Sequence, residues 1–233
     1  NIDKVASVKY HMSWPGPDPF YDFNVNDNEA RRNFYAINAV PNVRMDGTTD
    51  IHPGSLTQQM LDVAEAIPSF VQLNISESIS GGVMNITVTA DIGGVINAPT
   101  AIFIAAIENQ VFFTGGNGET EFRQVMRHLL PTSAGTNISV PTTPGQTETV
   151  TASYSIDPSF NVGELRAVAW LQNLNTLEVY QAAVSSGTPA PPTVDCEIDS
   201  SITADGLFPL PDDLDCFVNG DSVAQSIPVS YTH

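Results

Sequence analysis

Basic residues are scarce in this sequence. Its 233 residues include 8 Lys and Arg against 26 Asp and Glu, which gives a formal net charge of −18 at pH 7. A chain with so few cations has no surface that could neutralise phosphates, which excludes nucleic-acid binding. A basic helix on a membrane surface is excluded for the same reason. Because Lys4 and Lys9 are the only lysines and Asn, Ser and Thr replace them, we expect an exported protein.

Long apolar runs are also missing. The longest, Ala101 to Ile107, has the length of a strand, whereas a membrane-spanning helix needs ~18 apolar residues. We therefore expect no transmembrane segment. Neither end carries a signal or transit peptide and the chain does not begin with Met, so we interpret it as a processed or truncated product. With 42% hydrophobic residues the chain is globular rather than disordered.

The first 67 residues show both strand and helix signals. Residues 4–10 alternate between polar and apolar side chains, which predicts a strand. Asn26, with Glu29 three residues later, indicates a helix start, and this helix is predicted to end at Asn38. Apolar residues at helical spacing predict a second helix over residues 55–67.

From Pro68 the hydrophobic period becomes two. Strands this short and this closely spaced predict a β-sandwich, with the glycines of 115–118 forming a hairpin turn. One segment, Glu121 to Leu130, has apolar residues at helical spacing and is predicted to be a short helix or an irregular crossing between sheets. The predicted strands cover residues 70–75, 84–90, 100–108, 110–113, 148–156 and 165–173.

The amino-acid composition changes again near residue 186. A Pro-rich linker leads into about 40 residues, too few to bury a core of their own. Cys196 and Cys216 lie in this tail, and such a pair in a small exported segment predicts a structural disulfide rather than a redox site. In the loop-entropy model that disulfide contributes ~3 kcal/mol. Near the C-terminus, Ile227, Val229 and Tyr231 alternate like one face of a strand.

Several motifs, taken in order, resemble a known family. The first group resembles the second half of a thioredoxin-like domain: residues 10–21 (YHMSWPGPDPFY), 28–32, 35–37, 40–41 and 46–47. The second group fits the region downstream in the same family: residues 122–131, 135–136, 165–173 and 178–182. Together they resemble secreted and outer-membrane-associated proteins of Bacteroidetes-type bacteria, in which a thioredoxin-like part precedes an immunoglobulin-like β-domain.

The resemblance covers residues 5–184 and implies a fold class and a location. It implies an α+β, multi-domain chain with a partial thioredoxin-like α/β segment over residues 1–67. An immunoglobulin-like antiparallel β-sandwich would follow over 68–186, and the Pro-rich linker with the disulfide-stapled tail over 187–233. The implied location is extracellular, or the cell surface at the outer membrane.

The sequence departs from the family where its chemistry lies. The redox Cys-x-x-Cys precedes the region where this chain begins, and no such motif occurs here. Pro41, after Val40, matches the position of the family's cis-proline, and we expect a cis bond there without a redox partner. The thioredoxin-like sheet would also lack its first central strand and the next helix, leaving an edge open to pairing.

Metal-binding patterns are weak. The segment from Asp22 to Asp27 opens like a calcium loop, but it lacks Gly at the sixth position and has Asn33 at the twelfth, so it is no EF-hand. A looser Ca²⁺ site of Asp18, Asp22 and Asp27 remains open against helix capping and turn formation. No other cofactor is expected.

The four histidines are scattered without metal-ligand spacing. They are His11, His52, His128 and His233. His128 lies beside Arg123 and Arg127. That stretch could receive a carboxylate from outside or form internal salt bridges.

Modification sites are predicted at four positions. Three Asn-x-Ser/Thr sequons place N-glycosylation candidates at Asn74, Asn85 and Asn137. Ser222, in Asp221-Ser222-Val223, matches the short pattern that the resembled family's bacteria O-glycosylate in exported proteins.

Three functions follow from these observations. The first is a non-catalytic extracellular or cell-surface protein with protein partners, which could assemble into a filament or multisubunit complex when the strand around Val229 adds to another copy. The second is a thiol–disulfide oxidoreductase-like protein whose dithiol lies in a missing N-terminal portion. The third is a glycan-binding module that uses Trp14, Phe20 and Tyr21, which could equally pack around the Pro-rich turn.

Overall fold

The computed structural model describes residues 5–187, 194–195, 217–218 and 221–222. Contacts divide the chain into two compact units, Asn1–Thr188 and Pro189–His233. Strands β11 (Val194–Asp195), β12 (Phe217–Val218) and β13 (Asp221–Ser222) pair antiparallel, in that order, in the second unit. Five residues with predicted roles lie outside the described residues: Cys196, Cys216, Ile227, Val229 and Tyr231.

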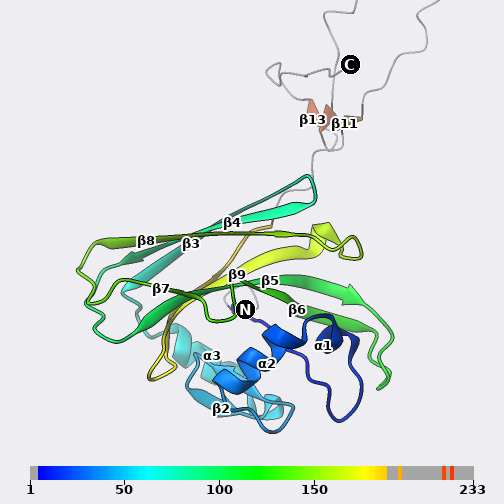
Figure 1. Ribbon diagram of the computed structural model, residues 1–233, viewed down its shortest axis with the longest axis horizontal. Helices are drawn as coiled ribbons and strands as arrows, with labels where there is room; N and C mark the ends of the chain where they lie inside the picture. Colours follow the sequence, from blue (N-terminus) through cyan, green and yellow to red (C-terminus); the bar gives the residue numbers. More distant parts are fainter. Residues whose placement is uncertain (1–4, 188–193, 196–216, 219–220, 223–233) are drawn as a thin grey trace, which may run out of the picture. The chain divides into compact units, whose positions relative to one another are not determined.

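Two antiparallel β-sheets pack face to face in the first unit (Figure 1). The smaller has the order β3-β4-β8 and the larger the order β10-β9-β5-β6, with β7 also paired to β5. The smaller sheet consists of β3 (Val71–Ser80), β4 (Val83–Ile92) and β8 (Gln146–Ser155). The larger consists of β5 (Thr100–Phe112), β6 (Glu121–Leu130), β7 (Thr136–Asn137), β9 (Leu165–Asn173) and β10 (Val179–Val184).

The main core lies between these sheets because the inward positions of both are apolar. Every second residue of β4, from Met84 to Ile92, is buried there. Ile102 and Ile104 of β5 and Leu171 of β9 meet them from the larger sheet. Successive side chains of a strand point to opposite faces, so the period of two in the sequence directly predicted this core.

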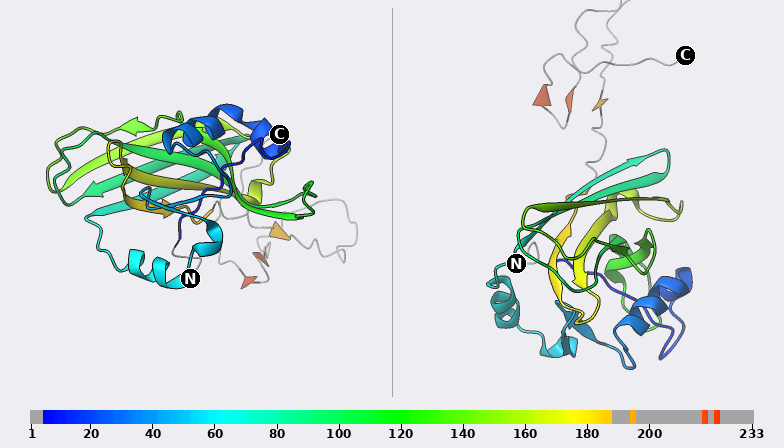
Figure 2. Two further views of the ribbon diagram at one scale, coloured as in Figure 1. Left: turned by 90° about the horizontal axis from the view of Figure 1, so that it is seen from below. Right: turned by 60° about the vertical axis from the view of Figure 1, so that its left-hand side comes forward.

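A third layer covers the other face of the larger sheet (Figures 1 and 2). Its contact with the sheet is a second buried cluster, in which Phe103 and Trp170 stack at 5.4 Å between ring centroids and Tyr10 and Phe34 pack around them. The N-terminal elements are α1 (Pro19–Phe23), α2 (Val25–Phe34), β1 (Val43–Met45), β2 (Thr49–Ile51), the 3-10 helix η2 (Pro53–Ser55) and α3 (Gln58–Glu65). A further 3-10 helix, η3 (Val162–Glu164), precedes β9.

The α+β fold class with a partial thioredoxin-like segment is wrong. The described chain is rich in β-sheet, and before residue 68 its strands are β1 and β2, which pair antiparallel with each other. Helices make up a small part of the described residues, and the two-stranded β1-β2 sheet is separate from the two larger sheets. The segment expected to be the first strand forms one parallel bridge, from Lys9 to Val125 of β6. Its apolar side chains, Ala6, Val8 and Tyr10, pack on the larger sheet. No disulfide is found among the described residues, and immunoglobulin-like kinship and the boundaries at 67 and 186 stay predictions.

The helix or irregular crossing predicted over residues 121–130 is also wrong, because this segment is strand β6. Its pairing with β5 shifts by one residue, so that Ala106 faces His128 but Ile107 faces Met126, and Arg127 is left unpaired as a bulge. The bulge buries three consecutive residues, Val125 to Arg127. Both faces of β6 are covered, and that burial produced the misleading spacing of apolar residues.

Among the described residues, no helix is long and apolar enough to cross a membrane.

Candidate functional site

Asp18, Asp22 and Asp27 serve separate purposes. Asp18 caps the first turn of α1 and lies 2.9 Å from His11 Nδ1 through its Oδ2 atom. Asp27 Oδ2 accepts a hydrogen bond from the backbone N–H of Leu129 at 2.8 Å, while Asp22 is exposed. Within the part of the chain that the structure describes, no group of three or more His, Cys, Asp or Glu side chains could hold a metal ion.

The described histidines contact structural partners rather than a nucleophile. His52 Nδ1 accepts from the backbone N–H of Gly54 at 3.0 Å, and His128 Nδ1 accepts from Asn24 Nδ2 at 3.3 Å. Burial lowers the pKa of His128, which keeps the ring neutral. The contact between Asn24 and His128 ties the start of α2 to β6. His233 lies outside the described residues.

Arg127 belongs to a buried ion pair. Its Nε and Nη2 atoms donate to Glu108 Oε2 at 2.8 and 2.5 Å, and Glu108 Oε1 accepts from the backbone N–H of Asn161 at 2.8 Å. The side chains of Arg127 and Glu108 are 8% and 4% exposed. Arg123 pairs with Glu121 of the same strand. Both arginines beside His128 thus form internal salt bridges, the second of the two alternatives that the sequence left open.

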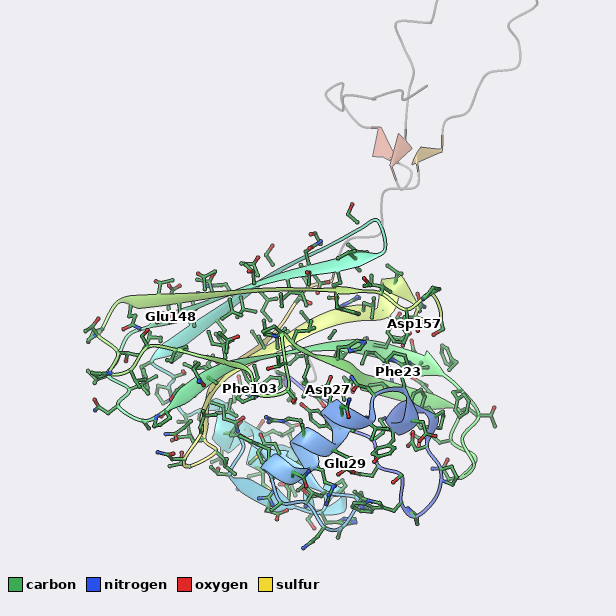
Figure 3. All side chains as sticks on the ribbon, in the orientation of Figure 1. Phe23, Asp27, Glu29, Phe103, Glu148 and Asp157 are labelled. Atoms are coloured by element: carbon green, nitrogen blue, oxygen red, sulfur yellow. The ribbon has the colours of Figure 1, made fainter. Side chains whose placement is uncertain are left out.

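Arg31 was not identified as important from the sequence, although it is 2% exposed. Its guanidinium lies 4.4–6.0 Å from the centroids of five aromatic rings. It donates to Tyr35 Oη at 2.7 Å and to Gln172 Oε1 at 3.3 Å. The rings are those of Tyr10, Phe34, Tyr35, Phe103 and Trp170. Arg31 therefore anchors α2 to the larger sheet, and Figure 3 shows Phe103 on the side of this helix that faces the sheet.

The aromatic residues proposed for glycan binding do not form an open platform. Phe20 is 6% exposed and packs against His11 and Phe122. Tyr21 Oη donates to Glu29 Oε1 at 3.1 Å. The Pro-rich turn thus uses these side chains for packing, and the Trp14–Pro15 bond within it is cis.

The remaining predicted positions are distributed over the surface. Asn74, Asn85 and Asn137 are exposed, and the first two lie on the outer face of the smaller sheet. Ser222 lies in β13. The Val40–Pro41 peptide bond is cis, with β1 following it.

A shallow groove at one end of the smaller sheet offers no catalytic groups. It has a volume of about 350 Å³ and is lined by residues 69–72, 91–93 and 145, of which Asp91 is the only charged one. Acid–base chemistry generally needs a titratable pair within reach of a substrate. The groove therefore does not indicate an active site.

The free edge of β8 is the most distinctive surface of the first unit. Within the described ranges, β8 pairs with β4 over ten residues in one unbroken register and with no other strand. Ile156 N–H, just past the strand, donates to Gly82 O at 2.8 Å across the same register. Hydrogen-bonded pairs alternate along an antiparallel ladder, so even-numbered residues of β8 bond β4 and odd-numbered ones present their N–H and C=O groups to the free edge.

The edges of the larger sheet are covered or interrupted. β3, the other edge strand of the smaller sheet, also pairs only with β4 among the described strands, and it is contacted by β10 at its first residue, Val71. β6 is flanked by the N-terminal segment, where Lys9 N–H donates to Gln124 O at 2.8 Å and Lys9 O accepts from Met126 N–H at 3.0 Å. β10 carries a register shift after Val179, and Gln181 Nε2 from β10 donates to Val71 O of β3 at 3.3 Å. Native proteins usually protect an edge strand with Lys, Pro, a bulge or a short length. β8 has none of these four features, and its one charged side chain, Glu148, lies on the inner face.

The outer face that ends at this edge is nearly uncharged. Its side chains are small and polar except for Val83, and Asp91 is the only acid among them. The face has no aromatic ring, which sugar stacking would require. Figure 3 shows side chains projecting from this face; Glu148, labelled on β8, belongs to the inner face. The outward residues are Gln72, Asn74, Ser76, Ser78, Ser80, Val83, Asn85, Thr87, Thr89, Asp91, Thr147, Thr149, Thr151, Ser153 and Ser155.

No protein-family model matches this sequence, and no curated protein matches it. Among solved structures, a domain of the outer membrane lipoprotein Omp28 from Porphyromonas gingivalis is similar to part of this chain. The likeness has 15% identity and a TM-score of 0.40, and it covers 53% of this chain and 92% of that chain. That neighbour is a domain of an outer membrane lipoprotein, and the likeness extends over about half of this chain.

Proposed function

We propose that this chain is a non-catalytic structural protein of the cell surface that assembles by strand addition, with β8 as the receiving edge. The observation that carries the proposal is the ten-residue register of β8, which has a partner on one side only in the described chain. Strand addition gives affinity through main-chain hydrogen bonds and specificity through alternate side chains. Every second residue of β8 offers such hydrogen bonds.

The strongest polar groups support a non-catalytic role because they are used within the fold. Glu108 and Arg127 bond each other, and Arg31 is enclosed by aromatic rings. The described histidines bond Asp18, Asn24 and a backbone N–H. Two serine hydroxyls do bond carboxylates, Ser185 with Glu77 and Ser159 with Asp157, but each carboxylate also accepts from a backbone N–H, of Ala167 and of Ser159 respectively, so these contacts hold the backbone in place.

Sedimentation velocity of the full chain over a range of concentrations tests the proposal. The wild type should form larger species, and Thr151→Pro should abolish them. Because the Thr151 N–H faces the free edge, proline there removes no bond to β4. Thr151→Val is the matched control, since it changes the same side chain but keeps the backbone donor, and it should assemble like the wild type.

The proposal is wrong if the wild type stays monomeric throughout, or if Thr151→Pro assembles as well as Thr151→Val does. Circular dichroism melting verifies that Thr151→Pro is folded. If that variant does not fold, Thr151→Asp replaces it, because an exposed acid on the edge leaves the β4 ladder intact while opposing the approach of another acidic chain.

A further inference from the structure

The free edge of β8 is complementary to itself. An added strand must set its own edge-facing residues opposite the odd-numbered residues of β8. A second β8, running antiparallel, does so when Thr151 lies opposite its own counterpart, since Thr149 then faces Ser153 and Thr147 faces Ser155. We propose that β8 of a second copy is the strand added at this edge, in this register, an inference that rests on the proposed function.

This register keeps both faces of the joined sheet continuous. On the inner face, Val150 lies opposite Ala152 of the second copy and Glu148 opposite Tyr154, while hydroxyl residues meet on the outer face. A shift by one residue would set Val150 opposite Thr151. Because a one-residue slip exchanges the two faces of a strand, that arrangement would expose apolar side chains to water.

Charge favours this edge and this register. The chain carries a net charge of −18, so most approaches of two copies bring like charges together. β8 has a single charged side chain, Glu148. In the proposed pair the two Glu148 residues are offset by six positions, about 20 Å at ~3.3 Å per residue. That separation exceeds the ~8 Å screening length at physiological ionic strength.

The product is a closed two-fold dimer rather than a filament. The same strand serves both copies, so the interface is self-complementary and is used up once formed. It joins the two smaller sheets into one six-stranded sheet, β3-β4-β8 continuing into the partner's β8-β4-β3, with one nearly uncharged hydroxyl face. A head-to-tail filament would instead require residues 226–231 to take the edge.

Disulfide trapping in the full chain tests the register. Opposed Cα atoms of a hydrogen-bonded antiparallel pair lie about 5.5 Å apart, within the ~4.4–6.8 Å that a disulfide spans. Thr151→Cys should therefore form a covalent dimer under mild oxidation, and peptide mapping should place the link between the two substituted positions. Thr149→Cys is the matched control, since its two copies would lie about 13 Å apart along the strands and could not link.

Mixing Thr149→Cys with Ser153→Cys should restore cross-linking between the two variants, because these positions face each other in the proposed register. One combination of results overturns the inference and leaves the proposed function intact. In it, assembly depends on the β8 edge and is abolished by deletion of residues 224–233, yet Thr151→Cys gives no link between its two copies. A wild type that never associates overturns both.

Discussion

The buried ion pair of Glu108 and Arg127 gives the sharpest prediction about stability. Both side chains are over nine-tenths buried, and three hydrogen bonds converge on the Glu108 carboxylate, two from Arg127 and one from the backbone of Asn161. Removing one member of such a pair leaves a buried charge uncompensated, at a cost of about 3–5 kcal/mol. In Glu108→Gln, the amide oxygen can still accept from Arg127, but the amide N–H₂ then faces the backbone N–H of Asn161, so that two donors oppose each other.

Glu108→Gln and Arg127→Met should therefore each lower the free energy of unfolding by about 3–5 kcal/mol. The double variant should lose clearly less than the sum, because it leaves no isolated buried charge. Arg127 also lies 4.5–5.4 Å from the rings of Phe20, Phe23 and Phe160. Met keeps much of this packing, so the non-additivity reports mainly on the charge.

Urea unfolding followed by circular dichroism and tryptophan fluorescence measures all four free energies. The pair of Glu29 and Arg32, about one third exposed and with Nε and Oε2 atoms 2.8 Å apart, supplies the control, since Glu29→Gln should cost no more than about 1 kcal/mol. Additive effects of the two core substitutions, or single losses as small as that of Glu29→Gln, would refute the reasoning.

Four further outcomes are expected. Arg31→Lys should cost about 2 kcal/mol and alter near-ultraviolet circular dichroism, because an ammonium cannot stack as a plane among five rings; an unchanged spectrum and midpoint would contradict this. Gly47→Ala should lower the free energy of unfolding by more than about 2 kcal/mol in urea, since an added Cβ would lie 1.8 Å from Leu177 O at a φ of +76°. Gly81→Ala, at a positive φ but in open space, should cost about 1 kcal/mol. Equal losses would refute the steric argument. Burial lowers the folded-state pKa of His128. The contribution of His128 to stability is therefore present above the unfolded-state pKa near 6.5 and is lost as the pH falls below that value. His128→Phe should flatten the dependence of the unfolding free energy on pH between 7.5 and 5.5, and a retained slope would count against this reasoning. Finally, raising salt from 10 to 150 mM should strengthen self-association in sedimentation velocity, because screening weakens repulsion between chains of charge −18; weakening by salt would point to an attractive ionic interface instead.

Local patterns predicted the elements that are buried on one face. Alternation in β4 and β8 predicted strands that the structure confirms, with longer bounds. The helix start near Asn26 was nearly right: α2 begins at Val25, because the side chain of Asn24 caps it by accepting from Asp27 N–H. Period and capping are short-range properties, and so they can be read from neighbouring residues.

β6 failed by the same reasoning because its burial is not local. Its bulge at Arg127 and its cover on both faces come from β5 and the N-terminal segment. Family motifs misled the assignment of residues 1–67, where the alternating first segment forms a single bridge to β6 rather than a strand of a thioredoxin-like sheet. The order of motifs along a sequence indicates relationship to a family. It does not determine which strands pair, because pairing depends on which distant strand has free backbone N–H and C=O groups.

The candidate site divides in the same way. That β8 lacks Lys and Pro and alternates Thr or Ser outward was visible in the sequence. That its edge is free was not, because strand order in a sheet depends on contacts far apart in the chain. Nothing in the sequence indicated that Arg31 is buried, because an arginine in an amphipathic helix normally faces solvent. Five aromatic rings from separate parts of the chain are needed to enclose it.

The sequence by itself determined the charge of −18, the absence of long apolar runs and the period-two core of the sandwich. These follow from side-chain chemistry and from the two-residue repeat of a strand. Only the tertiary structure decided which strand ends the smaller sheet and which charges are buried as partners. The physical reason is that backbone hydrogen bonds carry no side-chain identity, so the pairing of Ile86 with Ala152 and the exposure of the β8 edge arise from the packing of the whole unit.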